Sequence, residues 1–314
     1  MTDGQHRHGF TLGAWSLGEP PHDSTPYRDV ALAVEGNGLD FLMCGDHLFP
    51  YAPNQDALSL LSYWAGLTTR VSLGTGVLLL PLRDPVITAK ALATIDLLSD
   101  GRLIVGVGVG GEMQQEWDAM EIDPATRGRR CDEHIDLMRQ LWSGAPVSYD
   151  GTFRKVAGVV GSPVPVQPGG PPIIVGGRSE ASLRRAVRHQ GWFGYFMSPR
   201  TVKRCVDTLR ELAGGELPAG FRVSMSQYCV LGDDRASARQ ECIESLAGRY
   251  RQDVSEIVDA TGVFGTPADV AERAQEYVDA GVDDICWAPQ VDRHRMLDQI
   301  ERIAEARRLM GGRP

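Results

Sequence analysis

Residues 93–116 read ATIDLLSDGRLIVGVGVGGEMQQE, and this stretch contains one complete unit of an α/β fold. An amphipathic helix is stopped by Ser99-Asp100-Gly101, because these residues favour turns over helix interiors. The apolar run Leu103-Ile104-Val105 is typical of a parallel strand that is buried on both faces. Glycines between Gly106 and Gly111 then line the strand end, which leaves a backbone bare enough for a flat ligand to approach.

The same glycines satisfy G-x-G-x-x-G, the fingerprint of a dinucleotide-binding Rossmann fold. That fingerprint needs an acidic residue about 20 positions further on, at the end of a second strand. Arg129 and Arg130 stand at that distance, inside a helical pattern that no strand precedes. The sequence therefore disfavours a Rossmann fold.

Composition narrows the class of protein. The chain has 314 residues, a length that α/β barrels reach as one domain, so we expect residues 1–314 to form a single domain. Hydrophobic residues make up 42% and charged residues 23%, which is ordinary for a globular enzyme. A net charge of -9 argues against nucleic acid or an anionic membrane as partner, since both favour basic patches.

The cysteines and the start of the chain predict a cytoplasmic protein. The six cysteines are scattered without C-x-x-C spacing, which indicates buried thiols in a reducing compartment. Met1 to Phe10 is polar and charged, unlike a signal peptide, and no apolar run is long enough to span a bilayer.

Strand and helix patterns alternate along most of the chain. Eight strand candidates are separated by helical patterns, and this alternation requires a parallel sheet. Eight units close a (β/α)8 TIM barrel, which is the predicted fold, with an open doubly wound sheet as the alternative. The expected strands are Phe10–Leu17, Asp40–Cys44, Val71–Leu80, the run that starts at Leu103, Pro172–Gly177, Trp192–Met197, Phe221–Leu231 and Asp283–Ala288.

Two insertions are expected, after strands four and seven. Residues 143–171 are rich in Gly, Pro and Val without a helical period. We interpret them as an insertion over the barrel mouth, with a hairpin around Asp150-Gly151. The second insertion lies between the predicted helices 233–251 and 267–280.

Active sites of such barrels lie at the carboxyl ends of the strands. Those ends are rich in glycine and aromatic residues and contain few titratable groups. They lack the His/Asp/Glu cluster that a metal hydrolase needs, so no metal site is predicted, and no G-x-S-x-G elbow is present. One histidine and one glutamate among glycines and aromatics favour a planar cofactor and redox chemistry over hydrolysis.

Several short motifs, each weak alone, together resemble the bacterial luciferase-like monooxygenase family, and within it the coenzyme F420-dependent branch. The resemblance covers about residues 9–200, with a weaker match through Pro289. It implies a TIM barrel, F420 as cofactor (with FMN as the alternative) and a homodimer. The motifs, in the family's order, are Gly45-Asp46-His47, Leu73-Gly74-Thr75-Gly76-Val77, Leu98 to Leu103 running into Gly106 to Gly110, Leu137 to Gly144, Tyr149-Asp150-Gly151 and Pro171 to Gly177.

The resemblance assigns catalytic roles to two residues beside one cofactor contact. In similar deazaflavin enzymes the aspartate matched by Asp46 contacts the cofactor, and the histidine matched by His47 donates or relays a proton. Histidine titrates near neutral pH, which suits a proton partner for hydride transfer, although His47 could instead be only a hydrogen-bonded structural residue. Glu112 matches a second acid/base, but an extra glycine shifts the register, and a helix-start glutamate is the alternative.

Backbone features of three strand ends are expected to hold the cofactor. Gly76-Val77 matches a bulge that carries a non-prolyl cis peptide behind the cofactor ring in the family, unless Gly76 is an ordinary strand glycine. Gly176-Gly177-Arg178 matches the turn that holds the cofactor's phosphate, where amides and a guanidinium favour an anion, unless it is a plain βα turn. Further cofactor contacts are expected at Gly108, Val109, Gly110 and Gln115.

Aromatic residues are expected to line a substrate or ring pocket. The predicted set is Trp15, Phe49, Tyr51 and Trp287, with Tyr195 and Phe196 beside it. For Tyr195, Phe196 and Trp287 the alternative is that they are buried core aromatics. Arg200, Lys203 and Arg204 could attract the polyglutamate tail of F420 or simply be helix-surface charges. A full basic pocket like that of the sugar-phosphate relatives is not evident, so glucose 6-phosphate is not assumed as the substrate.

The predicted function is hydride transfer between F420 and an unidentified small organic substrate. The first alternative is an FMN-dependent monooxygenase that uses oxygen, a reaction to which a deazaflavin is poorly suited. The second alternative is a cofactor-binding protein without turnover, against which the presence of His47 and Glu112 argues weakly.

Overall fold

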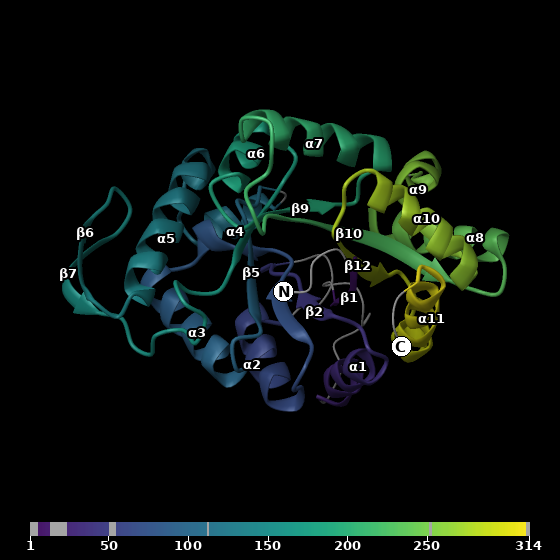
Figure 1. The fold of residues 1–314 in the computed structure, drawn as a ribbon, viewed down its shortest axis with the longest axis horizontal. Coiled ribbons are helices and arrows are strands. Elements are labelled where there is room, and N and C mark those ends of the chain that lie inside the picture. The colour runs from purple at the N-terminus through teal and green to yellow at the C-terminus, as the bar shows by residue number, and fades with distance from the viewer. Residues whose placement is uncertain (1–5, 13–23, 50–54, 112, 251–252, 312–314) are drawn as a thin grey trace.

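The computed structural model describes residues 6–12, 24–49, 55–111, 113–250 and 253–311. It contains a parallel β-barrel surrounded by helices (Figure 1). Each barrel strand pairs in parallel with its neighbours, and β9 pairs with β10 to close the ring. The eight barrel strands are β1 (Arg7–Leu12), β2 (Phe41–Cys44), β3 (Ser72–Thr75), β5 (Leu103–Gly108), β8 (Ile173–Gly176), β9 (Gly191–Tyr195), β10 (Arg222–Leu231) and β12 (Asp284–Pro289). The predicted (β/α)8 barrel is confirmed.

Helices follow the strands in the predicted alternation. They are α1 (Thr25–Gly36), α2 (Ala57–Leu67), α3 (Pro85–Leu98), α4 (Gln114–Ala119), α5 (Arg127–Trp142), α6 (Glu180–Ala186), α7 (Pro199–Leu212), α8 (Arg235–Tyr250), α9 (Ser255–Thr261), α10 (Pro267–Asp279) and α11 (Met296–Leu309). Within the described ranges, every helix is too short or too polar to span a lipid bilayer.

The stretch that opens the sequence analysis folds as its composition predicts. Asp84 caps α3 by accepting hydrogen bonds from the amides of Val86 and Ile87, and Pro85 occupies the first turn. The helix ends at Ser99, and Gly101 then adopts a φ of 74°, a left-handed conformation that glycine reaches without steric cost. The chain then enters β5, which leads directly to the glycine-lined strand end.

Two of the expected strands differ from the observed bounds by more than two residues. The first begins at Arg7 rather than Phe10, and the end of its expected range, residues 13–17, lies outside the described residues. The expected strand Val71–Leu80 divides into β3 and the short β4 (Leu78–Leu79), which pairs with β5 instead of β2.

The segment 143–171 contains the expected hairpin, formed by β6 (Pro146–Asp150) and β7 (Lys155–Val160). The expected position over the barrel mouth is wrong: the hairpin lies outside α5 (Figure 1). Its tip is held there by Glu133 of α5, which accepts hydrogen bonds from the amides of residues 152–154, and by an ion pair of Arg154 with Asp84. After β10, α8 is followed by α9 and by β11 (Val263–Gly265), which pairs in parallel with β10.

Candidate active site

The interior of the barrel is apolar below its carboxyl end. Met43, Phe193 and Cys286 come from three different strands and pack in one cluster, so these side chains point inward. The Sγ atom of Cys286 lies 3.3 Å from the Sδ atom of Met43. Val77 and Ile104 pack against the same cluster, which forms the floor beneath the strand ends.

Asp46, the predicted cofactor contact, is occupied by a buried ion pair. Its Oδ1 lies 2.6 Å from Arg83, its Oδ2 lies 3.0 Å from the same guanidinium, and Oδ2 also accepts a hydrogen bond from the amide of Leu79. Burial alone would lower the pKa of Arg83, but Asp46 and Asp56 raise it above its usual value. In this structure Asp46 therefore anchors the segment after β4 to the end of β2.

His47 forms a pair with Glu116, a residue that the sequence analysis does not name. Its Nδ1 lies 3.1 Å from Oε1 and 3.3 Å from Oε2 of Glu116. Because a carboxylate only accepts hydrogen bonds, Nδ1 carries the proton and Nε2 is left for a ligand. The Glu116 side chain is only 1% exposed, whereas that of His47 is 27% exposed. Glu116 thus holds the ring at Nδ1, while the side chain of His47 stays partly exposed.

Glu116 is further held by backbone groups at the end of β2. The amides of Leu48 and Phe49 lie 2.6 Å and 3.4 Å from its Oε1. Glu116 lies in the first turn of α4, directly after the glycine-rich end of β5. The sequence feature that points to Glu116 is its position: it is an acidic residue at the start of a helix that follows a strand, four positions after Glu112. Glu112 itself lies outside the described residues.

Glycines of β5 and β8 pack around the side chain of Val77. A Cβ atom at Gly108 would lie 2.5 Å from Cγ2 of Val77, and one at Gly176 would lie 3.0 Å from Cγ1. At Gly106, a Cβ atom would lie 2.1 Å from the carbonyl oxygen of Thr75. The predicted cis peptide between Gly76 and Val77 is present. Glycine at these positions therefore lets the backbones of β5 and β8 approach Thr75 and Val77 closely.

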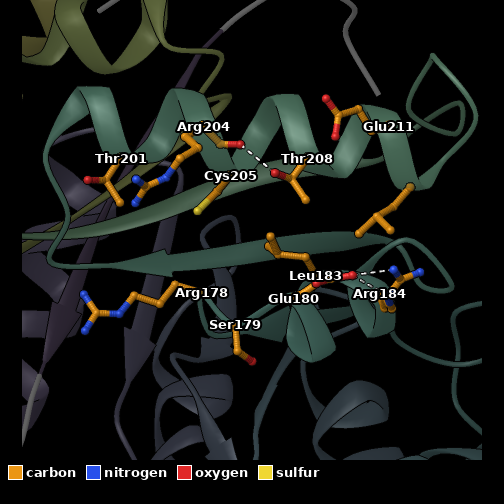
Figure 2. A pocket seen from close by; sticks show the side chains of 11 residues that line it. Arg178, Ser179, Glu180, Leu183, Arg184, Thr201, Arg204, Cys205, Thr208 and Glu211 are labelled. Carbon is orange, nitrogen blue, oxygen red and sulfur yellow. Dashed lines mark hydrogen bonds and ion pairs between the residues drawn. The ribbon is translucent and has the colours of Figure 1, made fainter.

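The turn after β8 places Arg178 in the lining of a groove. Gly177 has a φ of 118°, and its carbonyl accepts a hydrogen bond of 2.6 Å from the indole of Trp192. Arg178 then reaches a groove of about 840 Å³ between α6 and α7. Figure 2 shows Arg178 and Arg204 on opposite sides of the groove, with Thr201 beside Arg204. Lys203, by contrast, forms an ion pair with Asp207 on the surface of α7.

The other predicted site residues are dispersed. Phe49 is half exposed next to His47, Gln115 is exposed beside Glu116, and Val109 and Gly110 follow β5 directly. Trp15 and Tyr51 lie outside the described residues. Trp287 is only 1% exposed and packs in the core between strands and helices, where its ring stacks on His8. The structure therefore places Trp287 on the helix side of β12 and away from the mouth.

Comparison with known proteins identifies the family. Residues 10–284 match the model of the luciferase-like monooxygenases, so the chain belongs to this family. It is 29% identical over 307 residues to an F420-dependent glucose-6-phosphate dehydrogenase of Kineococcus radiotolerans, which covers 86% of this chain and 89% of the relative.

Two solved structures resemble the whole barrel. The monooxygenase RslO1 of Streptomyces bottropensis superposes with a TM-score of 0.82 at 25% identity, over 96% of this chain and 98% of that one. An F420-dependent secondary alcohol dehydrogenase, solved with an F420–acetone adduct, also gives a TM-score of 0.82, at 18% identity over 97% of this chain and 100% of that one. At that identity the second likeness supports the fold alone. The chain is therefore an oxidoreductase of the luciferase-like family.

Proposed function

We propose that this oxidoreductase uses coenzyme F420 and transfers a hydride between the deazaflavin and a small organic substrate. The observation that carries the proposal is the His47–Glu116 pair, in which a buried carboxylate holds Nδ1 of a partly exposed imidazole, with no partner for Nε2 among the described residues. The F420-dependent dehydrogenase of Kineococcus radiotolerans supports the choice of cofactor.

The residues at the strand ends fit a ring system with an anionic tail. Val77 offers a branched apolar surface, and the glycines around it keep other side chains away from that surface. Arg178 supplies a positive charge for the cofactor's phosphate. The groove that continues to Arg204 would take the acidic tail. When bound, the deazaflavin supplies a carbon that accepts or donates a hydride.

His47 accepts or donates the proton that accompanies the hydride. When an alcohol is oxidised, Nε2 accepts the hydroxyl proton; when a carbonyl is reduced, Nε2 donates it. Glu116 stabilises the charged imidazolium and holds the ring in one orientation, as a carboxylate does for a catalytic histidine. Glu112 is a candidate second acid/base. Asp46 positions His47 through the Arg83 ion pair, and in this proposal it touches the cofactor only if that pair rearranges.

The alternative is an FMN-dependent monooxygenase, and the likeness to the monooxygenase RslO1 favours a reaction with oxygen. The two functions differ in their need for oxygen. We expect turnover of an alcohol or ketone with F420 to proceed at the same rate with and without oxygen. The change in deazaflavin absorbance measures this rate. A strict requirement for oxygen together with FMN would overturn the proposal.

We further propose that the protein is a cytoplasmic homodimer. The six cysteines are buried and form no disulfide among the described residues, which fits a reducing compartment. Helix α3 exposes Ile87, Leu97 and Leu98 at 71%, 49% and 54%, and such an apolar stripe favours a second copy as partner. Analytical ultracentrifugation should give twice the chain mass, and Leu98→Glu should shift the protein toward monomer.

A further inference from the structure

One end of the groove between α6 and α7 is surrounded by exposed arginines. Arg178 and Arg204 line this end, and Arg200 lies one turn before Arg204 on the same side of α7, because residues four apart are neighbours on a helix surface. These three arginines form no ion pair with any residue that the structure describes. Lys203, by contrast, is neutralised by Asp207 at 2.9 Å. The end of the groove next to the barrel mouth therefore carries uncompensated positive charge.

Two of these guanidiniums act on the same point in the groove. Burial raises the pKa of the Cys205 thiol, which lines the groove, and the charges of Arg204 and Arg178 both lower it. Figure 2 shows Arg178 and Arg204 at the same end of the groove, on facing elements. The first turn of α7, Pro199 to Val202, adds the positive end of the helix dipole and carries a positive side chain rather than a negative one. An anion between the two arginines would be attracted by all of these charges.

The opposite end of the groove has the opposite charge. Glu211 lines the groove two helical turns after Arg204, which is about 10 Å further along α7. Its carboxylate has no cation partner among the described residues. On α6, Glu180 and Arg184 pair with each other, with Nε of the arginine 3.0 Å from Oε1 of the glutamate, so this side adds no net charge. The groove is thus positive near the mouth and negative far from it.

A chain of carboxylates would meet different charges along such a groove. The first carboxylates beyond the cofactor's phosphate would pass between Arg178 and Arg204, where the positive charge is not neutralised. An extended peptide chain advances about 3.5 Å per residue, so the distance from Arg204 to Glu211 corresponds to about three residues. Later carboxylates would approach Glu211, and like charges repel. The groove therefore favours the start of an acidic tail and disfavours its continuation.

We infer that this groove makes the protein selective for the length of the polyglutamate tail of F420. Arg178, Arg200 and Arg204 bind the first carboxylates of the tail, and Glu211 sets the limit beyond which further glutamates add no affinity. The inference rests on the proposed function, because it takes F420 as the ligand. It goes beyond that function by naming the form of F420 that the protein prefers, one with a short tail, and the residue that sets the limit.

Titration with F420 of defined tail length tests the inference. Forms with no glutamate, with two and with six are added separately to the full-length protein, and binding is followed by fluorescence at low and at high salt. We expect about tenfold tighter binding with two glutamates than with none, and no further gain with six. High salt should abolish the gain from the tail, because the arginines are exposed and salt screens exposed charges.

Two variants with matched controls separate the two ends of the groove. Arg204→Gln should remove most of the gain from the first two glutamates, whereas Arg308→Gln, at an exposed position on α11, should retain it. Glu211→Lys should make the form with six glutamates bind about two- to fivefold more tightly than the form with two, because repulsion becomes attraction. Glu305→Lys, also exposed on α11, makes the same change in net charge and should leave the two forms equal.

The inference is overturned if F420 binds with the same affinity with and without its tail, or if affinity in the wild type rises from two to six glutamates. It is also overturned if Glu211→Lys and Glu305→Lys behave alike. If no form of F420 binds, the proposed function fails together with the inference. Binding of F420 that ignores tail length contradicts the inference alone, so the two failures are distinguishable.

Discussion

The two ends of the barrel use charge in opposite ways. At the amino end, Asp284 accepts hydrogen bonds from Arg7 at 2.8 and 2.9 Å, from Arg222 and from the hydroxyl of Ser224 at 3.0 Å, so its carboxylate is saturated. At the carboxyl end, the described residues give His47 a partner at Nδ1 alone, and its side chain is 27% exposed. One end of the barrel thus stabilises the fold, while the other keeps the ring of His47 accessible to a ligand.

The largest expected effect is at the amino end. Asp284→Asn should lower the free energy of unfolding by about 3–5 kcal/mol, because Arg7 and Arg222 lose their shared counter-charge. Turnover per folded molecule should stay unchanged. Urea denaturation measures the first quantity, with Asp279→Asn, an exposed position, as control. A stable variant with reduced turnover would contradict the division between the two ends.

At the carboxyl end the expected effect is catalytic. His47→Ala should lower turnover by about 10²-fold, as is typical for loss of a general acid/base, while F420 affinity and the unfolding midpoint change little. Steady-state kinetics and a cofactor titration measure the two effects. His294→Ala, on an exposed segment, is the control. If turnover of His47→Ala stays within a few-fold of wild type, His47 is structural.

Removal of the Glu116 charge should lower kcat less than removal of the His47 ring. Glu116→Gln keeps the hydrogen bonds to Nδ1 and to the amide of Leu48 but removes the negative charge. We expect kcat to fall about tenfold with little change in cofactor affinity, since stabilisation of the imidazolium is weakened. Asp118→Asn, two residues away on α4 and exposed, should have no effect. An unchanged kcat in Glu116→Gln would restrict Glu116 to holding the loop after β2.

The smallest expected effect is a pH dependence of stability that arises from His8 in strand β1. Burial, followed by the charge of Arg307, lowers the pKa of His8 from 6.5 to about 3. At pH values below 6.5, His8 therefore binds a proton in the unfolded chain but not in the folded protein, so stability falls as the pH drops below 6.5. His8→Phe should remove about 1 kcal/mol per pH unit of this slope between about pH 6 and pH 5. Urea denaturation across that range measures it, and an unchanged slope would refute the assignment to His8.

The fold could be predicted because its signals are local. Pro85, the turn at Ser99 to Gly101 and the apolar run of β5 lie next to one another, and the structure has α3 and β5 where they indicate. The start of β1 was missed, because a charged residue such as Arg7 belongs in a strand only through its partner Asp284, which is 277 positions away.

The site was predicted in part for the same reason. His47 stands at a strand end and could be named from its position, whereas its partner Glu116 is 69 residues away and no spacing indicates the contact. Trp287 was expected at the mouth because β12 ends there. All six residues of β12 are buried, so the sequence gives no alternation from which to infer that Trp287 faces the helices.

The central claim, that the carboxyl end holds a deazaflavin, is tested most directly by titrating the purified protein with F420 and with FMN and following fluorescence. The account predicts that F420 binds appreciably more tightly than FMN, and that Arg178→Gln weakens F420 binding more than Arg184→Gln, whose partner is Glu180. Tight binding of FMN with no measurable binding of F420 would contradict it.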